Sequence, residues 1–151
     1  MNRGVIALVA CGLLGSAMLS QAQDWLQAQR WEQRLVIVDA PLEAALTPAM
    51  ASYDDALRER RMAVWTLDDS SLRWIGGSAP SASARVDEAQ LASLRQALAR
   101  AASRPGLHLF GLDGGLKASR SRADQLQELV EAVDSMPMRI REARWDSARS
   151  E

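Results

Sequence analysis

Two short aliphatic runs, separated by a segment long enough for one helix, constrain the fold most. In the first run, Leu35 to Val38, four consecutive aliphatic residues predict a strand that is buried on both faces. The second run, Met62 to Leu67, predicts another buried strand. Between them, Thr47-Pro48 combines a hydroxyl cap with a proline, which is typical of the start of a helix. A strand, a helix and a strand at this spacing predict a βαβ unit with parallel strands.

The second half of the chain predicts a helix, a hairpin and a closing helix. Asp87 and Gln90 have the spacing of a capping box at the start of the first of these helices. Residues 107–112 predict a strand, and Asp113-Gly114-Gly115 predicts a tight hairpin turn, because glycine adopts the positive φ that such turns require. The closing helix has helically spaced apolar residues: Leu126, Leu129, Val130 and Val133. A short edge strand is also expected at residues 72–75.

This order of elements predicts one α/β domain of thioredoxin-like organisation, in which helices flank a four-stranded mixed sheet. A chain of 151 residues is long enough for one such domain with its own core. The formal net charge of -1 excludes the basic surface that nucleic-acid binding requires.

The first 22 residues have the anatomy of a secretory signal peptide. Arg3 precedes an apolar run, and small residues close it at Ser20-Gln21-Ala22. This predicts an exported protein, periplasmic or secreted, with a domain over residues 23–145 and a frayed tail over 146–151. Two alternatives to a cleaved signal peptide are a membrane anchor that is never cleaved and a lipoprotein signal in which Cys11 is lipidated. No later segment is long and apolar enough to span a membrane.

Cys11 is the only cysteine of the chain, so a mature domain that starts at Gln23 contains no thiol. A disulfide, a thiol nucleophile and a cysteine metal site are therefore excluded from that domain. No metal site and no cofactor is predicted.

A family resemblance rests on three segments: residues 31–38 (WEQRLVIV), 107–117 (LHLFGLDGGLK) and 134–139 (DSMPMR). They resemble the DUF4174 family, exported bacterial proteins of unknown function that are similar to a domain in some animal extracellular-matrix proteins. The resemblance covers most of residues 31–144 but not 72–85, and it implies a thioredoxin-like domain without redox cysteines. It also implies a structural role for the motif residues Trp31, Arg34, Asp113, Gly114, Gly115, Met136, Pro137 and Met138.

A candidate binding site lies at the carboxyl ends of the two parallel strands, where open α/β sheets usually bind ligands. Asp39 ends the first strand, and Asp68 and Asp69 follow the second. Converging carboxylates would hold a hard cation or transfer protons. The other interpretation is that each aspartate only caps a strand end or a turn.

Pro105 is expected to enter from the same edge of the sheet, and His108 lies inside the strand that follows it. Thioredoxin-like proteins commonly carry a cis-proline before the third strand, so the resemblance implies that Pro105 is either this cis-proline or a trans proline that ends the preceding helix. His108, the only histidine, is expected to be packed with both nitrogens satisfied, although acid–base use remains open.

Arg139 and the tryptophans each allow a structural and a functional interpretation. Arg139 either pairs with Asp134 or Glu142, while the neighbouring methionines fill gaps, or belongs to a partner surface. Core packing is favoured over a ligand platform for three tryptophans that lie in or beside strands: Trp31, Trp65 and Trp74.

Two functions follow from these patterns. The first is a non-redox binding or interaction module of the cell envelope, whose partner would be an envelope protein. The second is a non-thiol enzyme or divalent-cation binder that uses Asp39, Asp68 and His108.

Overall fold

The computed structural model describes residues 25–80, 86–102 and 104–149. The predicted signal peptide and Cys11 lie outside these residues. The strands are β1 (Arg34–Asp39), β2 (Met62–Leu67), β3 (Leu72–Gly77), β4 (Leu107–Phe110) and β5 (Leu116–Arg120). The helices are α2 (Glu43–Glu59), α3 (Glu88–Ala101), α4 (Leu126–Asp134) and α5 (Pro137–Arg149), with 3-10 turns at Ala40–Leu42 and Ala123–Gln125.

The sheet has five strands in the order β3-β2-β1-β4-β5. β1 and β2 are parallel, as the βαβ pattern predicts, and every other pair is antiparallel. The α/β class is confirmed, but the expected count of four strands is wrong. The short segment that begins at Leu72 extends to Gly77 and pairs with β2, which adds an edge strand to the predicted sheet.

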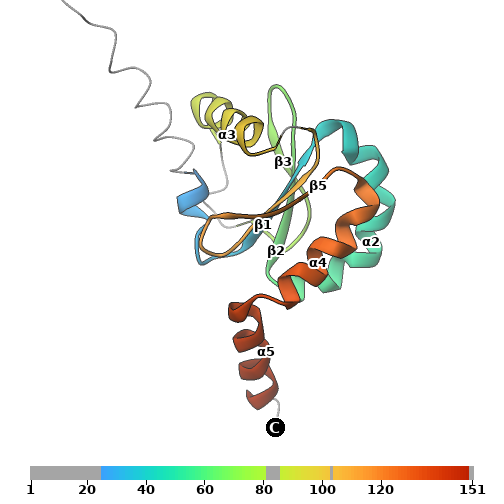
Figure 1. The fold of residues 1–151 in the computed structure, drawn as a ribbon, viewed down its shortest axis with the longest axis vertical. Coiled ribbons are helices and arrows are strands. Elements are labelled where there is room, and N and C mark those ends of the chain that lie inside the picture. The colour runs from blue at the N-terminus through green and yellow to red at the C-terminus, as the bar shows by residue number, and fades with distance from the viewer. Residues whose placement is uncertain (1–24, 81–85, 103, 150–151) are drawn as a thin grey trace, which may run out of the picture.

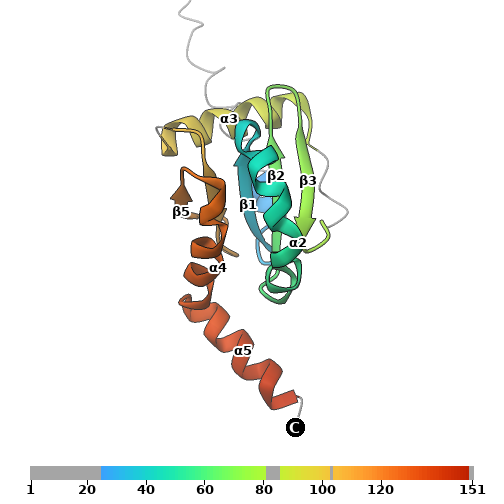
Figure 2. The ribbon, with the colours of Figure 1, turned by 90° about the vertical axis from the view of Figure 1, so that its right-hand side faces the viewer.

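Helices cover both faces of the sheet (Figures 1 and 2). Alternate residues of β1 point to opposite faces. Val36 and Val38 pack in one cluster with α2 and α4, whereas Leu35 and Ile37 pack in the other with α3. All four side chains are buried, which confirms that this strand is buried on both faces. None of the helices in the described part of the chain is long and apolar enough to cross a membrane.

The main helix of the βαβ unit begins before the predicted position. α2 starts at Glu43, directly after a 3-10 turn that contains Pro41. The hydroxyl of Thr47 donates to the carbonyl of Glu43 at 2.9 Å, so it bonds back along the helix instead of capping it. Pro48 lies inside the helix, where its missing N–H removes one intrahelical hydrogen bond.

The capping box forms as predicted, and the hairpin forms with a first strand two residues shorter than predicted, because β4 ends at Phe110. The Asp87 carboxylate accepts from the backbone N–H of Gln90, and the Gln90 side chain accepts from the backbone N–H of Asp87. Gly114 adopts a φ of 78° in the turn between β4 and β5. At the C-terminal end, α5 is helical through Arg149 where the sequence predicts an irregular tail.

The tryptophans divide between core and surface. Trp65 is buried, and its ring meets that of Trp25 edge-on, with centroids 5.7 Å apart. Trp31 is 55% exposed and Trp74 is 38% exposed, so the core prediction is wrong for both. Trp74 lies on the edge strand β3, and Trp31 adopts a φ of 65° in the turn before β1.

Candidate functional site: the strand-end cleft

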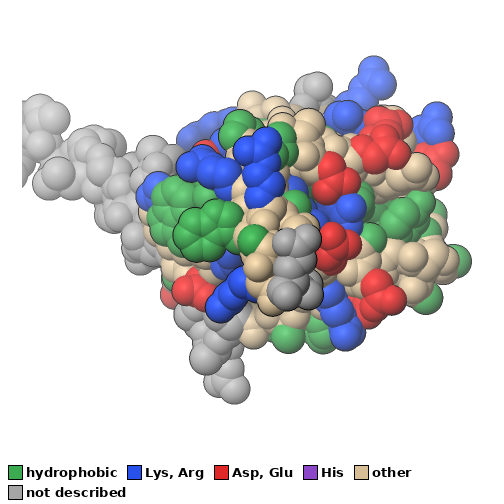
Figure 3. Space-filling model, turned by 90° about the horizontal axis from the view of Figure 1, so that it is seen from below, with side chains coloured by type: hydrophobic (Ala, Val, Ile, Leu, Met, Phe, Trp, Pro, Cys, Tyr) green, Lys and Arg blue, Asp and Glu red, His purple; other side chains and the backbone are tan. Residues whose placement is uncertain are grey.

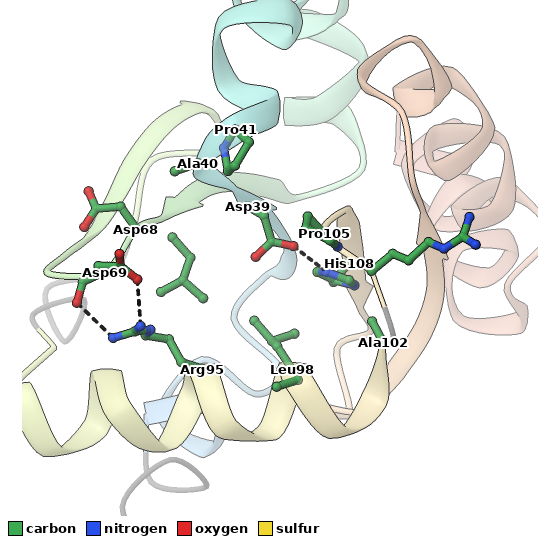
Figure 4. A pocket seen from close by; sticks show the side chains of 13 residues that line it. Asp39, Ala40, Pro41, Asp68, Asp69, Arg95, Leu98, Ala102, Pro105 and His108 are labelled. Atoms are coloured by element: carbon green, nitrogen blue, oxygen red, sulfur yellow. Dashed lines mark hydrogen bonds and ion pairs between the residues drawn. The ribbon is translucent and has the colours of Figure 1, made fainter.

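A cleft of about 560 Å³ lies between the carboxyl ends of β1 and β2 and the helix α3 (Figure 4). It is called here the strand-end cleft, and four of the five predicted binding residues line it: Asp39, Asp68, Asp69 and Pro105. Apolar side chains form part of its wall: Pro41, Leu67, Leu98, Ala99 and Ala102. As expected, the residues at the ends of the two parallel strands and Pro105 lie at the same edge of the sheet.

Two hydrogen bonds hold the carboxylate of Asp39 in the strand-end cleft. Its Oδ2 accepts a hydrogen bond from the backbone N–H of Gly106 at 2.7 Å and lies 3.1 Å from Nε2 of His108. Within the described residues no hydrogen bond joins Oδ1, and Figure 4 shows this oxygen pointing into the cleft. Burial raises the pKa of Asp39, but the hydrogen bonds from His108 and Gly106 outweigh it and hold the pKa below its ordinary value.

His108 connects Asp39 to a serine that the sequence patterns do not single out. Its Nδ1 lies 3.0 Å from the hydroxyl of Ser119 on β5, so both ring nitrogens are satisfied, as predicted. Because an ionised Asp39 can only accept, its hydrogen bond with His108 requires a proton on Nε2, and Nδ1 faces the Ser119 hydroxyl, which can donate or accept. His108 is only 1% exposed, so it acts on the cleft by holding Asp39 in place.

Asp68 does not join Asp39. Its Oδ1 accepts from the backbone N–H groups of Ser70 and Ser71, both at 2.7 Å, and its Oδ2 accepts from the hydroxyl of Ser71 at 2.7 Å. The hydrogen bonds from Ser71 and Ser70 lower the pKa of Asp68 to about 2. Figure 4 shows its carboxylate pointing away from Asp39. Among the described residues, no three His, Cys, Asp or Glu side chains form a group that could hold a metal ion.

Two arginines that the sequence patterns do not identify give the cleft its positive charge. Arg95 of α3 donates to the Asp69 carboxylate at 2.7 Å and to the Asp69 carbonyl at 2.9 Å. Arg104 also lines the cleft, and no carboxylate in the described residues pairs with it. In the sequence, Arg95 is marked only by its place directly after Leu94, which belongs to the apolar face of the predicted helix.

Pro105 is trans, because the described residues contain no cis peptide bond. The cis alternative is therefore wrong, but Pro105 does not end the preceding helix either, because α3 already ends at Ala101. Its place next to Gly106 matters to the site, since the N–H of Gly106 holds Asp39.

The model of the DUF4174 family, described as a domain of unknown function, matches residues 25–142. The chain belongs to the DUF4174 family. Neither a curated protein nor a solved structure matches it. In this DUF4174 domain the matched region begins at Trp25, which packs against Trp65, and ends at Glu142 on α5.

The remaining motif residues of the DUF4174 domain gather at the opposite end of the sheet from the cleft. Arg139 is buried there and donates to Glu59, and its Nε lies 3.8 Å from Asp134. Arg34, only 1% exposed, donates from both terminal nitrogens to Glu142, at 3.2 and 3.3 Å. Pairing of Arg139 with Asp134 is thus correct, whereas its pairing with Glu142 is wrong.

The MPMR segment builds the start of α5. Pro137 is the first residue of this helix, a position that suits its missing N–H and fixed φ. Met136 packs against the core cluster beneath α4, and Met138 is half-buried. Arg139 therefore lies outside the strand-end cleft and fastens α5 to the end of α2.

Proposed function

We propose that this DUF4174 domain is an exported, non-redox binding module that takes its ligand in the strand-end cleft. The observation that carries the proposal is the clamped carboxylate of Asp39, whose Oδ1 accepts no hydrogen bond from the described residues and points into a cleft lined by apolar side chains and two arginines. A volume of about 560 Å³ is within the usual range for small-ligand sites.

The charges of the cleft indicate the chemistry of that ligand. Oδ1 of Asp39 offers an acceptor for an ammonium or amide N–H group. Arg104 offers a guanidinium for a carboxylate. A ligand that carries both an N–H donor and an anionic group, as free amino acids and short peptides do, would satisfy both sides.

Thiol chemistry receives no support in this cleft, because no cysteine is among the described residues that line it and thiol–disulfide exchange requires thiolates. The alternative function, a divalent-cation binder or non-thiol enzyme, has less support. Asp68 uses both carboxylate oxygens within its own turn, and His108 is buried behind Asp39.

A binding screen tests the proposal. Free amino acids and dipeptides are added to the ¹⁵N-labelled protein, and the amide resonances of Ala40, Ala102 and Gly106 are followed by NMR. We expect at least one compound to shift these resonances. Arg104→Glu should weaken its binding by about tenfold or more, because one charge-assisted contact is replaced by repulsion.

Arg100→Glu is the matched control, since Arg100 is exposed on α3 but does not line the cleft. The proposal fails if no compound shifts the cleft resonances, or if the Arg100 and Arg104 variants lose binding equally. A Mg²⁺ or Ca²⁺ titration that moves the same resonances, and that Asp39→Asn abolishes, would favour the cation binder instead.

A further inference from the structure

The helix α5 extends away from the body of the domain (Figures 1 and 2). Its first turns are nevertheless fastened by two buried arginines, since Arg139 donates to Glu59 and Arg34 donates to Glu142. The base of α5 is therefore fixed, and the rest of the helix is exposed. Such a preformed surface loses little conformational entropy when it binds a partner.

A groove of about 460 Å³ runs along one side of α5. From α5 it is lined by residues on one helical face, among them Met138, Arg141, Trp145 and Arg149. Arg61, which precedes β2, lines it from the body of the domain. We name these five residues the α5 groove. Trp145 is 75% exposed, so most of its indole has no cover in the described structure.

Two of the three arginines of the α5 groove are available to a partner's carboxylates, whereas the third, Arg61, lies 4.0 Å from Glu142. The acidic residues Glu59 and Glu142 at its base already bond to Arg139 and Arg34. In the described part of the chain, by contrast, no carboxylate forms an ion pair with Arg141 or Arg149. The view along this end of the molecule shows hydrophobic side chains bordered by Lys and Arg side chains (Figure 3).

We propose that the α5 groove docks an acidic segment of a partner protein, which brings an apolar side chain to Trp145 and carboxylates to Arg141 and Arg149. This interaction goes beyond the proposed function, because it uses the end of the sheet opposite the strand-end cleft. Trp145 and Arg149 also lie beyond the residues that match the family. The inference therefore concerns this chain and not DUF4174 domains in general.

A protein segment fits this surface better than an anionic membrane does. Tryptophan, methionine and arginine are enriched at the centres of protein interfaces. The groove is concave, so a flat bilayer surface cannot fill it. An extended segment can enter the groove and place its own carboxylates beside Arg141 and Arg149.

Selection from a random-peptide library, displayed on phage and applied to the purified full chain, tests the proposal. We expect enrichment of sequences that place acidic residues beside an aromatic or aliphatic residue. Fluorescence anisotropy with the most enriched peptide should show about tenfold weaker binding for Arg141→Glu and for Trp145→Ala. Binding should also weaken as salt is added, since the contacts are ionic.

Arg144→Glu is the matched control, because it makes the same charge change on α5 but Arg144 lines a different groove. Circular dichroism of each variant checks that α5 remains helical. Equal losses for the Arg141 and Arg144 variants, or enriched peptides without acidic residues, would overturn the proposal. So would binding to phosphatidylglycerol vesicles in the absence of any peptide binding, or a dimer in sedimentation velocity that Trp145→Ala dissociates.

Discussion

Arg34 and Glu142 are separated by 108 residues, yet the two terminal nitrogens of Arg34 bond to the two carboxylate oxygens of Glu142. Arg34 opens the first strand of the sheet, and Glu142 lies on the last helix. One of the same nitrogens also donates to the carbonyl of Arg60 at 2.7 Å. A buried guanidinium thus links three parts of the chain that are distant in sequence.

Glu142→Ala should lower the free energy of unfolding by about 2 kcal/mol, because it leaves a buried cation without its carboxylate partner. Urea denaturation measures this change. Asp55→Ala serves as the control, since Asp55 is exposed on α2, and should change the free energy by less than about 0.5 kcal/mol. If both variants unfold at the same urea concentration, the link contributes nothing to stability.

The proton on His108 should reside on Nε2, because the lowered pKa of Asp39 keeps that carboxylate an acceptor. Long-range ¹H–¹⁵N NMR spectra of the imidazole distinguish the two tautomers. Asp39→Ala should lower the free energy of unfolding by about 1–3 kcal/mol, since it leaves the Nε2–H of His108 and the N–H of Gly106 without an acceptor. Ser119→Ala, at the exposed end of the chain of hydrogen bonds, should cost less. A proton on Nδ1 would refute this arrangement.

Stability should fall in acid through Asp39 and Asp68. Both have a lower pKa in the folded state than in the unfolded chain, where an aspartate titrates near 3.9. Their contribution is therefore complete above about pH 5 and is lost as the pH falls through about 4 toward 2, where Asp68 titrates in the folded state. NMR titration of the carboxyl carbons gives each value directly. A pKa of Asp68 near 4 in the folded protein would contradict the turn hydrogen bonds.

Gly114→Ala should destabilise the protein by about 1 kcal/mol, because the residue has a φ of 78° that side-chain-bearing residues rarely adopt. A Cβ there would also lie 3.0 Å from Cγ of Arg30. Gly115→Ala is the adjacent control, since the nearest atom to its added Cβ is the Lys117 ammonium nitrogen at 3.4 Å. Thermal unfolding should separate the two variants, and equal melting temperatures would show that the turn tolerates either change.

Local patterns predicted the strands, the hairpin and the position of the candidate site. Four consecutive aliphatic residues identified β1, and the parallel βαβ rule then placed Asp39 and Asp68 at one edge. The direction of the Asp68 side chain could not be predicted, because it depends on the hydrogen bonds of its own turn with Ser70 and Ser71. Asp39 and Asp68 thus lie at the same edge of the sheet, but their carboxylates do not point to a common site.

The missed residues are those that only the packed fold brings together. Ser119 reaches His108 because of the register between β4 and β5, in which these two residues are direct partners. Arg95 lines the cleft because α3 packs across the strand ends, and Arg104 lines it from the loop that follows α3. Trp31 and Trp74 were assigned to the core from their closeness to strands, but a positive φ and an edge strand expose them.

The bond between Arg34 and Glu142 also has a consequence for the order of events during synthesis. Because Glu142 is made 108 residues after Arg34, a growing chain cannot form this ion pair until α5 is available. Contacts of such long sequence separation form late, after the loop between them has closed. Nascent chains that stop before Glu142 should therefore remain open at this end of the sheet and be sensitive to proteases until the last helix closes it.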